Sequence, residues 1–187
     1  MGGPRRRSLR LQGFDYSQPG AYFVTMCTDG RRPLFGEVLD NRVVLAPAGK
    51  IVAQAWEWLA DQYTSLELDA WVLMPNHLHG ILVIHDDAYL GIGRGGSRPS
   101  TCGFGQVTAP TPSIRKPIGS LVGAFKTVST KDVNVLRGRP GARLWQRGYY
   151  ERVLRDEGEL RRARNYIINN PAQRSLDREN PDRRATA

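Results

Sequence analysis

Alternating apolar and polar positions predict four strands in this chain. The four segments share an enrichment in β-branched and aromatic residues, and they span 21–28, 66–74, 77–84 and 144–154. The second and third segments are separated only by Pro75 and Asn76, which predicts a tight hairpin. A short extra strand is expected at 41–45.

Apolar residues that recur every three or four positions predict two helices, over about 48–63 and 117–130. A third helix is expected after Asp156, because Glu159 follows three residues later and completes a capping box. Pro171 ends this third helix, since proline cannot continue a helix at that position.

The order of these elements is strand, helix, strand, strand, helix, strand and a final helix. This order is typical of the ferredoxin-like split βαβ fold of the α+β class, with one antiparallel sheet and helices on one face. The final helix is an addition to that pattern. Leu160, Ala163 and Ile167 fall on one side of it, so this helix is also expected to pack on the sheet.

Composition divides the chain into one folded unit and two polar ends. Its 187 residues predict a single domain, which is expected to span 20–172. Residues 1–19 form a basic arm, and residues 173–187 form a charged tail. Within the domain, residues 86–114 are rich in Gly, Ser, Pro and Thr and have no helix or strand period, which predicts a long flexible loop.

The charge balance is strongly basic, with 27 Lys and Arg against 18 acidic residues and a net charge of +9. This points to a polyanionic partner, nucleic acid before an anionic membrane surface. No apolar run is long enough to cross a membrane, and the basic N-terminus lacks the apolar segment of a secretion signal. Because Cys27 and Cys102 lie in no paired motif, we expect a cytoplasmic protein without disulfides.

Two histidines open the third predicted strand. Side chains alternate along a strand, so His77 and His79 project to the same face, roughly 7 Å apart. Imidazole is the commonest metal ligand among side chains, and two at this spacing can share one divalent ion. The alternative is a pair of ordinary strand-end histidines with local hydrogen bonds. His85 lies roughly 20 Å from His79 and cannot reach the same ion.

A tyrosine and an asparagine stand one turn apart on the final helix. Tyr166 lies at the edge of the apolar stripe, and Asn170 follows on the same face. The phenol can offer a nucleophile and the amide a hard oxygen ligand, although Tyr166 could also simply border the core. Tyr149 and Tyr150 are weaker nucleophile candidates; we expect one in the core and the other where it could stack on a base.

Taken together, these residues resemble the HUH endonucleases, which are named for a His-hydrophobic-His motif such as His77-Leu78-His79. The resemblance is closer to the single-tyrosine transposases, and among them to the REP-associated tyrosine transposases. It covers about residues 5–172 and rests on VLMPNHLHGILVI, LWQRGYYERVLRDEGELRRARNYIINNP, GAFK and the basic RRRSLRL. Compact single-tyrosine transposases usually carry Gln four residues after the tyrosine, whereas Asn170 followed by Pro171 is the REP-associated variant.

The resemblance implies a role for each of these residues. Tyr166 would be the nucleophile, and His77, His79 and Asn170 would hold Mg²⁺ or Mn²⁺. The substrate would be single-stranded hairpin DNA, such as repeated extragenic palindromes in the nucleoid, and a 5′-phosphotyrosine link would form. Monomers and homodimers both occur among such proteins. Several basic residues could hold the strand: Arg5, Arg6, Arg7, Lys126, Arg161, Arg162 and Arg164.

Two other functions remain open on the sequence. The first is a hairpin DNA- or RNA-binding protein without chemistry, which would form no covalent adduct with a strand. The second is a metal-dependent hydrolase in which the two histidines activate water. It would release free 5′-phosphate ends and would keep its activity when Tyr166 is replaced.

Overall fold

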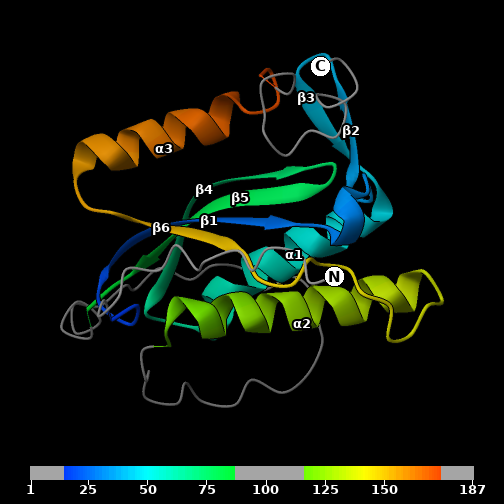
Figure 1. Cartoon of the computed structure of the whole chain (residues 1–187), viewed down its shortest axis with the longest axis horizontal. Coiled ribbons are helices and arrows are strands. Elements are labelled where there is room, and N and C mark those ends of the chain that lie inside the picture. The colour runs from blue at the N-terminus through cyan, green and yellow to red at the C-terminus, as the bar shows by residue number, and fades with distance from the viewer. Residues whose placement is uncertain (1–14, 87–115, 174–187) are drawn as a thin grey trace, which may run out of the picture.

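The structure is a computed structural model that describes residues 15–86 and 116–173, and its main element is a four-stranded sheet (Figure 1). The strands are β1 (Gly20–Cys27), β4 (Leu66–Met74), β5 (His77–Ile84) and β6 (Tyr150–Leu154). They lie in the order β4-β5-β1-β6, and every neighbouring pair is antiparallel. This is the predicted α+β, ferredoxin-like split βαβ arrangement, so the fold prediction is confirmed.

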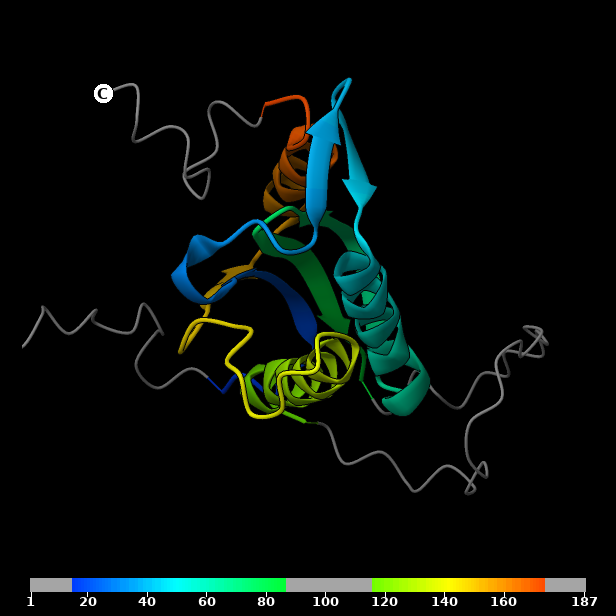
Figure 2. The ribbon, with the colours of Figure 1, turned by 90° about the vertical axis from the view of Figure 1, so that its right-hand side faces the viewer.

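Helices lie on both faces of this sheet. α1 (Pro47–Gln62) and α2 (Ile118–Leu136) cover one face, and α3 (Glu157–Asn169) lies on the other (Figures 1 and 2). The larger core lies between the sheet and the pair α1 and α2. It includes Tyr22 and Leu78 from the sheet. A smaller core of Ile81, Leu154 and Ile167 lies under α3.

Gly80 allows α1 to approach β5 closely. A Cβ at this position would lie 2.6 Å from Cζ2 of Trp56, and the Trp56 side chain is fully buried. The indole packs edge to face on Phe125 of α2, with ring centroids 5.1 Å apart. The ring therefore occupies the space against the backbone between His79 and Ile81, and only glycine leaves room for it.

One helix and one strand differ in length from the sequence predictions. The predicted helix at 117–130 continues to Leu136, because Val133 extends the buried stripe one turn beyond Ser129. The predicted strand at 144–154 begins only at Tyr150.

The residues before Tyr150 form a loop instead of a strand. Trp145 makes a single β-bridge with Thr28, and its buried ring packs on Phe35 and Phe125 at the end of the core. The chain then turns at Gly148, whose φ is +81°. An apolar segment that fills the end of a core has the composition of a strand without its pairing, which explains the wrong prediction.

The short extra strand expected at 41–45 is β3 (Arg42–Leu45). Its partner is β2 (Gly36–Leu39), in a segment for which no strand is predicted. Asp40 and Asn41 join the two strands, and both have positive φ, as a two-residue hairpin requires. The Asp-Asn pair is the signal from which this hairpin could have been predicted.

Several sequence predictions fall outside the described residues. They concern Arg5, Arg6 and Arg7 of the basic arm, the loop at 86–114 apart from Asp86, and the tail at 173–187 apart from Gln173. Within the described part of the chain, no helix combines the length and the apolar composition needed to span a membrane.

Replacing Gly80 by alanine should destabilise the fold, because the new methyl group would overlap the buried indole of Trp56. Overpacking of this kind costs about 1–3 kcal/mol, and urea denaturation of Gly80→Ala measures it. Gly123→Ala is the matched control, since a Cβ there meets no atom within 4 Å. Equal losses in the two variants would contradict this account of the packing.

Candidate functional site

His77 and His79 lie on the face of β5 that α3 covers. They share this face with Ile81, which packs under α3. Both side chains are buried, with 1% and 3% of their surface exposed. Their ring centroids are 4.5 Å apart, closer than the roughly 7 Å that the strand repeat gives their backbones. The predicted shared face is therefore present, and the two rings are in contact.

Three side chains orient the ring of His79. Its Nδ1 lies 2.8 Å from the hydroxyl of Thr25, the residue directly opposite on β1. The ring stacks on Phe23, with centroids 5.6 Å apart. The tautomer that donates from Nδ1 to Thr25 leaves the lone pair of Nε2 facing the hydroxyl of Tyr166, 3.2 Å away.

His77 is oriented by the hairpin turn that precedes it. Its Nδ1 lies 2.8 Å from Oδ1 of Asn76, a turn residue that is itself buried. Since this amide oxygen can only accept, Nδ1 carries the proton and the lone pair lies on Nε2. Both histidines therefore have Nδ1 held by a neighbour, an arrangement that is typical of metal-ligating histidines.

Tyr166 reaches this pair of histidines from α3. Its ring centroid lies 5.1 Å from that of His79 and 6.0 Å from that of Phe23, both nearly edge to face. The side chain remains 40% exposed, so a substrate can approach the phenol from solvent. The structure thus brings together Tyr166 and His79, which are far apart in the sequence.

An ion pair fixes α3 on the sheet next to this contact. Two nitrogens on one edge of the Arg164 guanidinium donate to the carboxylate of Asp69 on β4, Nε at 3.0 Å and Nη2 at 2.6 Å. The hydrogen bond from Arg164, helped by its charge, holds the pKa of Asp69 below its ordinary value, against a smaller opposing effect of burial. Glu157 lies 3.6 Å from the same guanidinium. Arg164, predicted to contact nucleic acid, is therefore engaged within the protein.

The direction in which α3 runs over the sheet predicts that Asn170 lies on the side of His77. Arg164 lies over Asp69, next to the stretch of β4 that pairs with Gly80, and Tyr166 lies over His79. The next turn of the helix continues in the same direction along β5. Asn170 is 2% exposed, and among the described residues its Oδ1 has no hydrogen-bond partner. A buried amide oxygen in this state suits a bound cation.

The donor atoms fit a divalent ion. Two imidazole nitrogens and one amide oxygen suit several first-row ions, and the amide oxygen is a donor that Mg²⁺ and Mn²⁺ accept. The three donors are neutral, so they would leave the charge of an ion available for an anionic substrate. Only two of these three ligands are of the residue types that most often bind metals. Within residues 15–86 and 116–173, no group of three or more His, Cys, Asp or Glu side chains could hold a metal ion.

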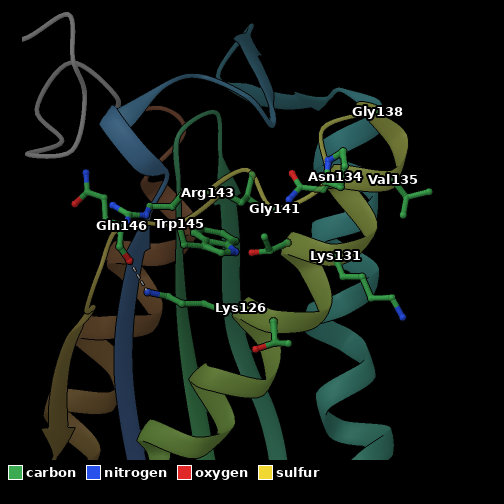
Figure 3. A pocket seen from close by; sticks show the side chains of 13 residues that line it. Lys126, Lys131, Asn134, Val135, Gly138, Gly141, Arg143, Trp145 and Gln146 are labelled. Atoms are coloured by element: carbon green, nitrogen blue, oxygen red, sulfur yellow. Dashed lines mark hydrogen bonds between the residues drawn. The ribbon is translucent and has the colours of Figure 1, made fainter.

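The other predicted cationic residues are dispersed. Lys126 projects from α2, on the opposite face of the sheet, and its ammonium donates to the carbonyl oxygen of Gln146 (Figure 3). It also donates to the carbonyl oxygen of Gly148. It lines a cavity of about 670 Å³ there, and burial lowers its pKa to about 8. Lys126 therefore ties the loop after α2 to the helix. Arg161 and Arg162 are exposed on α3.

The weaker candidates do not contact the histidine pair in the interactions found among the described residues. His85 is 2.7 Å from Glu67 at the other end of β5, as its distance along the strand predicts. Tyr149 donates to the carboxylate of Glu151, and Tyr150 is 42% exposed.

Sequence reasoning misses the residues that orient the histidines, namely Phe23, Thr25 and Asn76. Asn76 was visible only as a turn residue. Phe23 and Thr25 have the parity that places them on one face of β1. Their contact with His79 depends on the register between β1 and β5, which the pattern of apolar residues does not specify.

Comparison with known proteins identifies one relative in sequence and one solved structure with a similar fold. No protein-family model matches this chain. An uncharacterized protein of Haemophilus influenzae is 32% identical over 166 residues, which cover 89% of this chain and 88% of that protein. The structure of a REP-associated tyrosine transposase bound to a REP hairpin matches with a TM-score of 0.51 and 18% identity, over 95% of this chain and 76% of that one. The match to the transposase structure shows that the two chains share a fold.

The ion pair between Asp69 and Arg164 should make the stability of the protein depend on pH. The pKa of Asp69 is lowered in the folded state, so its contribution is present above the unfolded value of about 3.9 and is lost as the pH falls through the folded value. Because Arg164 is 40% exposed and screened by water, we expect Asp69→Asn to cost about 1 kcal/mol at neutral pH.

Urea denaturation of Asp69→Asn and the unchanged protein, repeated at falling pH, measures this contribution. The difference should persist at neutral pH and shrink only below about pH 4. Asp61→Asn, an exposed acid on α1, is the control and should show little difference at any pH. A difference for Asp69→Asn that is the same at every pH would contradict the role of the ion pair.

Proposed function

The chain belongs to one family with the Haemophilus influenzae protein and has the fold of the REP-associated tyrosine transposase, and on this basis we propose that it is a DNA strand transferase. It cuts single-stranded DNA at hairpins and rejoins it through a covalent link to Tyr166. The observation that carries the proposal is the 3.2 Å contact between the Tyr166 hydroxyl and Nε2 of His79. This contact places the phenol beside the nitrogen that would hold the ion, and such proximity is what an activated nucleophile requires.

The proposed reaction exchanges one phosphoester for another. The phenolic oxygen of Tyr166 attacks phosphorus, the bond from phosphorus to the 3′ oxygen breaks, and a 5′-phosphotyrosine forms. The phenol proton leaves to solvent, to which the side chain of Tyr166 is open, and it is matched by the proton that the departing 3′ oxygen takes up. Since the new link is again a phosphodiester, a second 3′-hydroxyl can attack it and release Tyr166 without any other energy source.

A phosphodiester is anionic, and a phenol with an ordinary pKa near 10 is a weak nucleophile. A divalent ion held by His77, His79 and Asn170 would polarise a non-bridging oxygen and lessen both obstacles. The buried Oδ1 of Asn170 supports the presence of such an ion, because no hydrogen bond from the described residues satisfies it. We propose Mg²⁺ or Mn²⁺ in this place.

The proposed substrate is hairpin DNA of the kind seen with the transposase of the same fold, whose structure contains a REP hairpin. The net charge of +9 supports a nucleic-acid partner in the nucleoid of the cytoplasm. The contact of Tyr166 with His79 of its own chain supports a site that is built within one chain.

Replacing Tyr166 by phenylalanine should abolish a covalent adduct with single-stranded DNA while leaving the fold intact, because only the hydroxyl is removed. Labelled hairpin strands are incubated with the protein and Mg²⁺ and resolved on a denaturing gel. Loss of the nucleophile should lower adduct formation by more than about 10⁴-fold. Tyr63→Phe, at the end of α1, is the matched control and should form adduct normally.

The same gels distinguish the two alternative functions. Free 5′-phosphate ends that persist in Tyr166→Phe would indicate a hydrolase that uses water as its nucleophile. A protein that binds the hairpin and gives neither adduct nor cleavage in its unchanged form would be a binding protein, and the proposal would then be wrong.

The divalent ion can be tested without measuring activity. Mn²⁺ binding, followed by electron paramagnetic resonance, should weaken at least tenfold in His77→Ala, His79→Ala and Asn170→Ala, because each removes a proposed ligand. His85→Ala is the matched control, since that imidazole pairs with Glu67 at the other end of the strand. If all four variants bind Mn²⁺ like the unchanged protein, the proposed ion site does not exist.

A further inference from the structure

Part of the sheet face that holds the histidines lies beside α3 rather than beneath it. α3 packs mainly on β4 and β5. Its contacts with β6 include Leu154 and the ion pair of Arg152 with Glu159, near the end of β6 where the chain enters α3. The opposite end of β6 begins at Tyr150, which is 42% exposed.

Strand register places Tyr150 in one row with the proposed site. His79 of β5 is opposite Thr25 of β1, and Thr25 is opposite Tyr150 of β6. Residues in such a row share a face, and two strand spacings separate Tyr150 from His79 by about 10 Å. The hydrogen bond between Thr25 and His79 shows that these side chains share a face, and the contact of His79 with Tyr166 shows that α3 lies on it.

The rings of this region form one cluster, of which Tyr150 and Tyr166 are exposed. Phe23 contacts three of them: His79 with centroids 5.6 Å apart, Tyr166 at 6.0 Å and Tyr150 at 6.4 Å. Phe23 therefore links the exposed tyrosine of β6 to the proposed nucleophile. A large aromatic side chain that stays 42% exposed beside such a site has a free surface on which a flat, apolar ligand can stack.

Cationic side chains border the same edge of the sheet. Arg152 follows Tyr150 on the same face of β6 and is 54% exposed, although Glu159 neutralises part of its charge. Arg147 precedes the strand and is exposed. An exposed aromatic ring with positive charge on both sides along the chain is the arrangement that holds single-stranded nucleic acid, with stacked bases and paired phosphates.

We propose that Tyr150 is a stacking platform for an unpaired base of the DNA strand, next to the phosphate that Tyr166 attacks. This inference rests on the proposed function for the identity of the strand and adds a binding subsite to it. Stacking beside the nucleophile holds the chain against β6 and presents the neighbouring phosphate to the phenol. Tyr150 is thus a positioning residue, since its ring takes no part in bond making.

The test measures binding alone, in EDTA, so that no strand is cut. The probes are a fluorescein-labelled oligothymidylate of about 12 nucleotides and an abasic chain of the same length, both followed by fluorescence anisotropy. Tyr150→Leu should bind oligothymidylate about tenfold more weakly and should bind the abasic chain as the unchanged protein does. Tyr150→Phe keeps the ring and should bind both probes normally. Leu39→Ala, an exposed apolar residue on β2, is the control.

A loss that appears only when both the ring and the base are present shows that the two interact. The proposal is overturned if Tyr150→Leu binds oligothymidylate as tightly as the unchanged protein does. It is also overturned if this variant loses the same factor on both probes. Failure of Tyr166 to form an adduct would remove the proposed chemistry and would leave this binding result unaffected, so the two failures are distinguishable.

Discussion

The docking of α3 on the sheet is the contact on which the site depends, because it brings the phenol of Tyr166 to the imidazole of His79. This helix buries little: Ile167 is its only fully buried residue, and Leu160 and Ala163 are partly buried. Burial of such side chains contributes a few kcal/mol, and the partly exposed ion pair of Arg164 adds about 1 kcal/mol. α3 is therefore held less firmly than the helices on the other face, a property that suits an element beside which a DNA strand must enter.

The histidines, in contrast, are buried on an inner strand of the sheet. β5 is a central strand, and Thr25 and Asn76 hold the Nδ1 atoms of His79 and His77. The protein's own hydrogen bonds therefore fix the orientation of both imidazole rings. A bound ion would find its ligands already oriented and would not have to order them, which favours binding.

The sequence predicts this site as far as local patterns reach. Strand parity places His77 and His79 on one face, and the Asp156 capping box opens α3, where its carboxylate accepts a hydrogen bond from the backbone of Glu159. Periodicity does not specify the register between β1 and β5, so Phe23 and Thr25 stay unrecognised. It also does not distinguish a strand from an apolar loop, and for this reason the loop at Trp145 is taken for the start of β6. Contacts between distant segments decide both questions.

Side chains along β5 alternate between two faces, and one face fills the core while the other carries the candidate site. Leu78 and Leu82 fill the larger core, and Gly80 between them accepts the indole of Trp56. The intervening positions, His77 and His79, carry the candidate chemistry towards α3. A change in the packing of Trp56 would consequently reach His79 through the backbone of the residue beside it. The large core thus supports the two histidines, whereas the positions of Tyr166 and Asn170 depend on the smaller core under α3, and the site is complete only when both cores are intact.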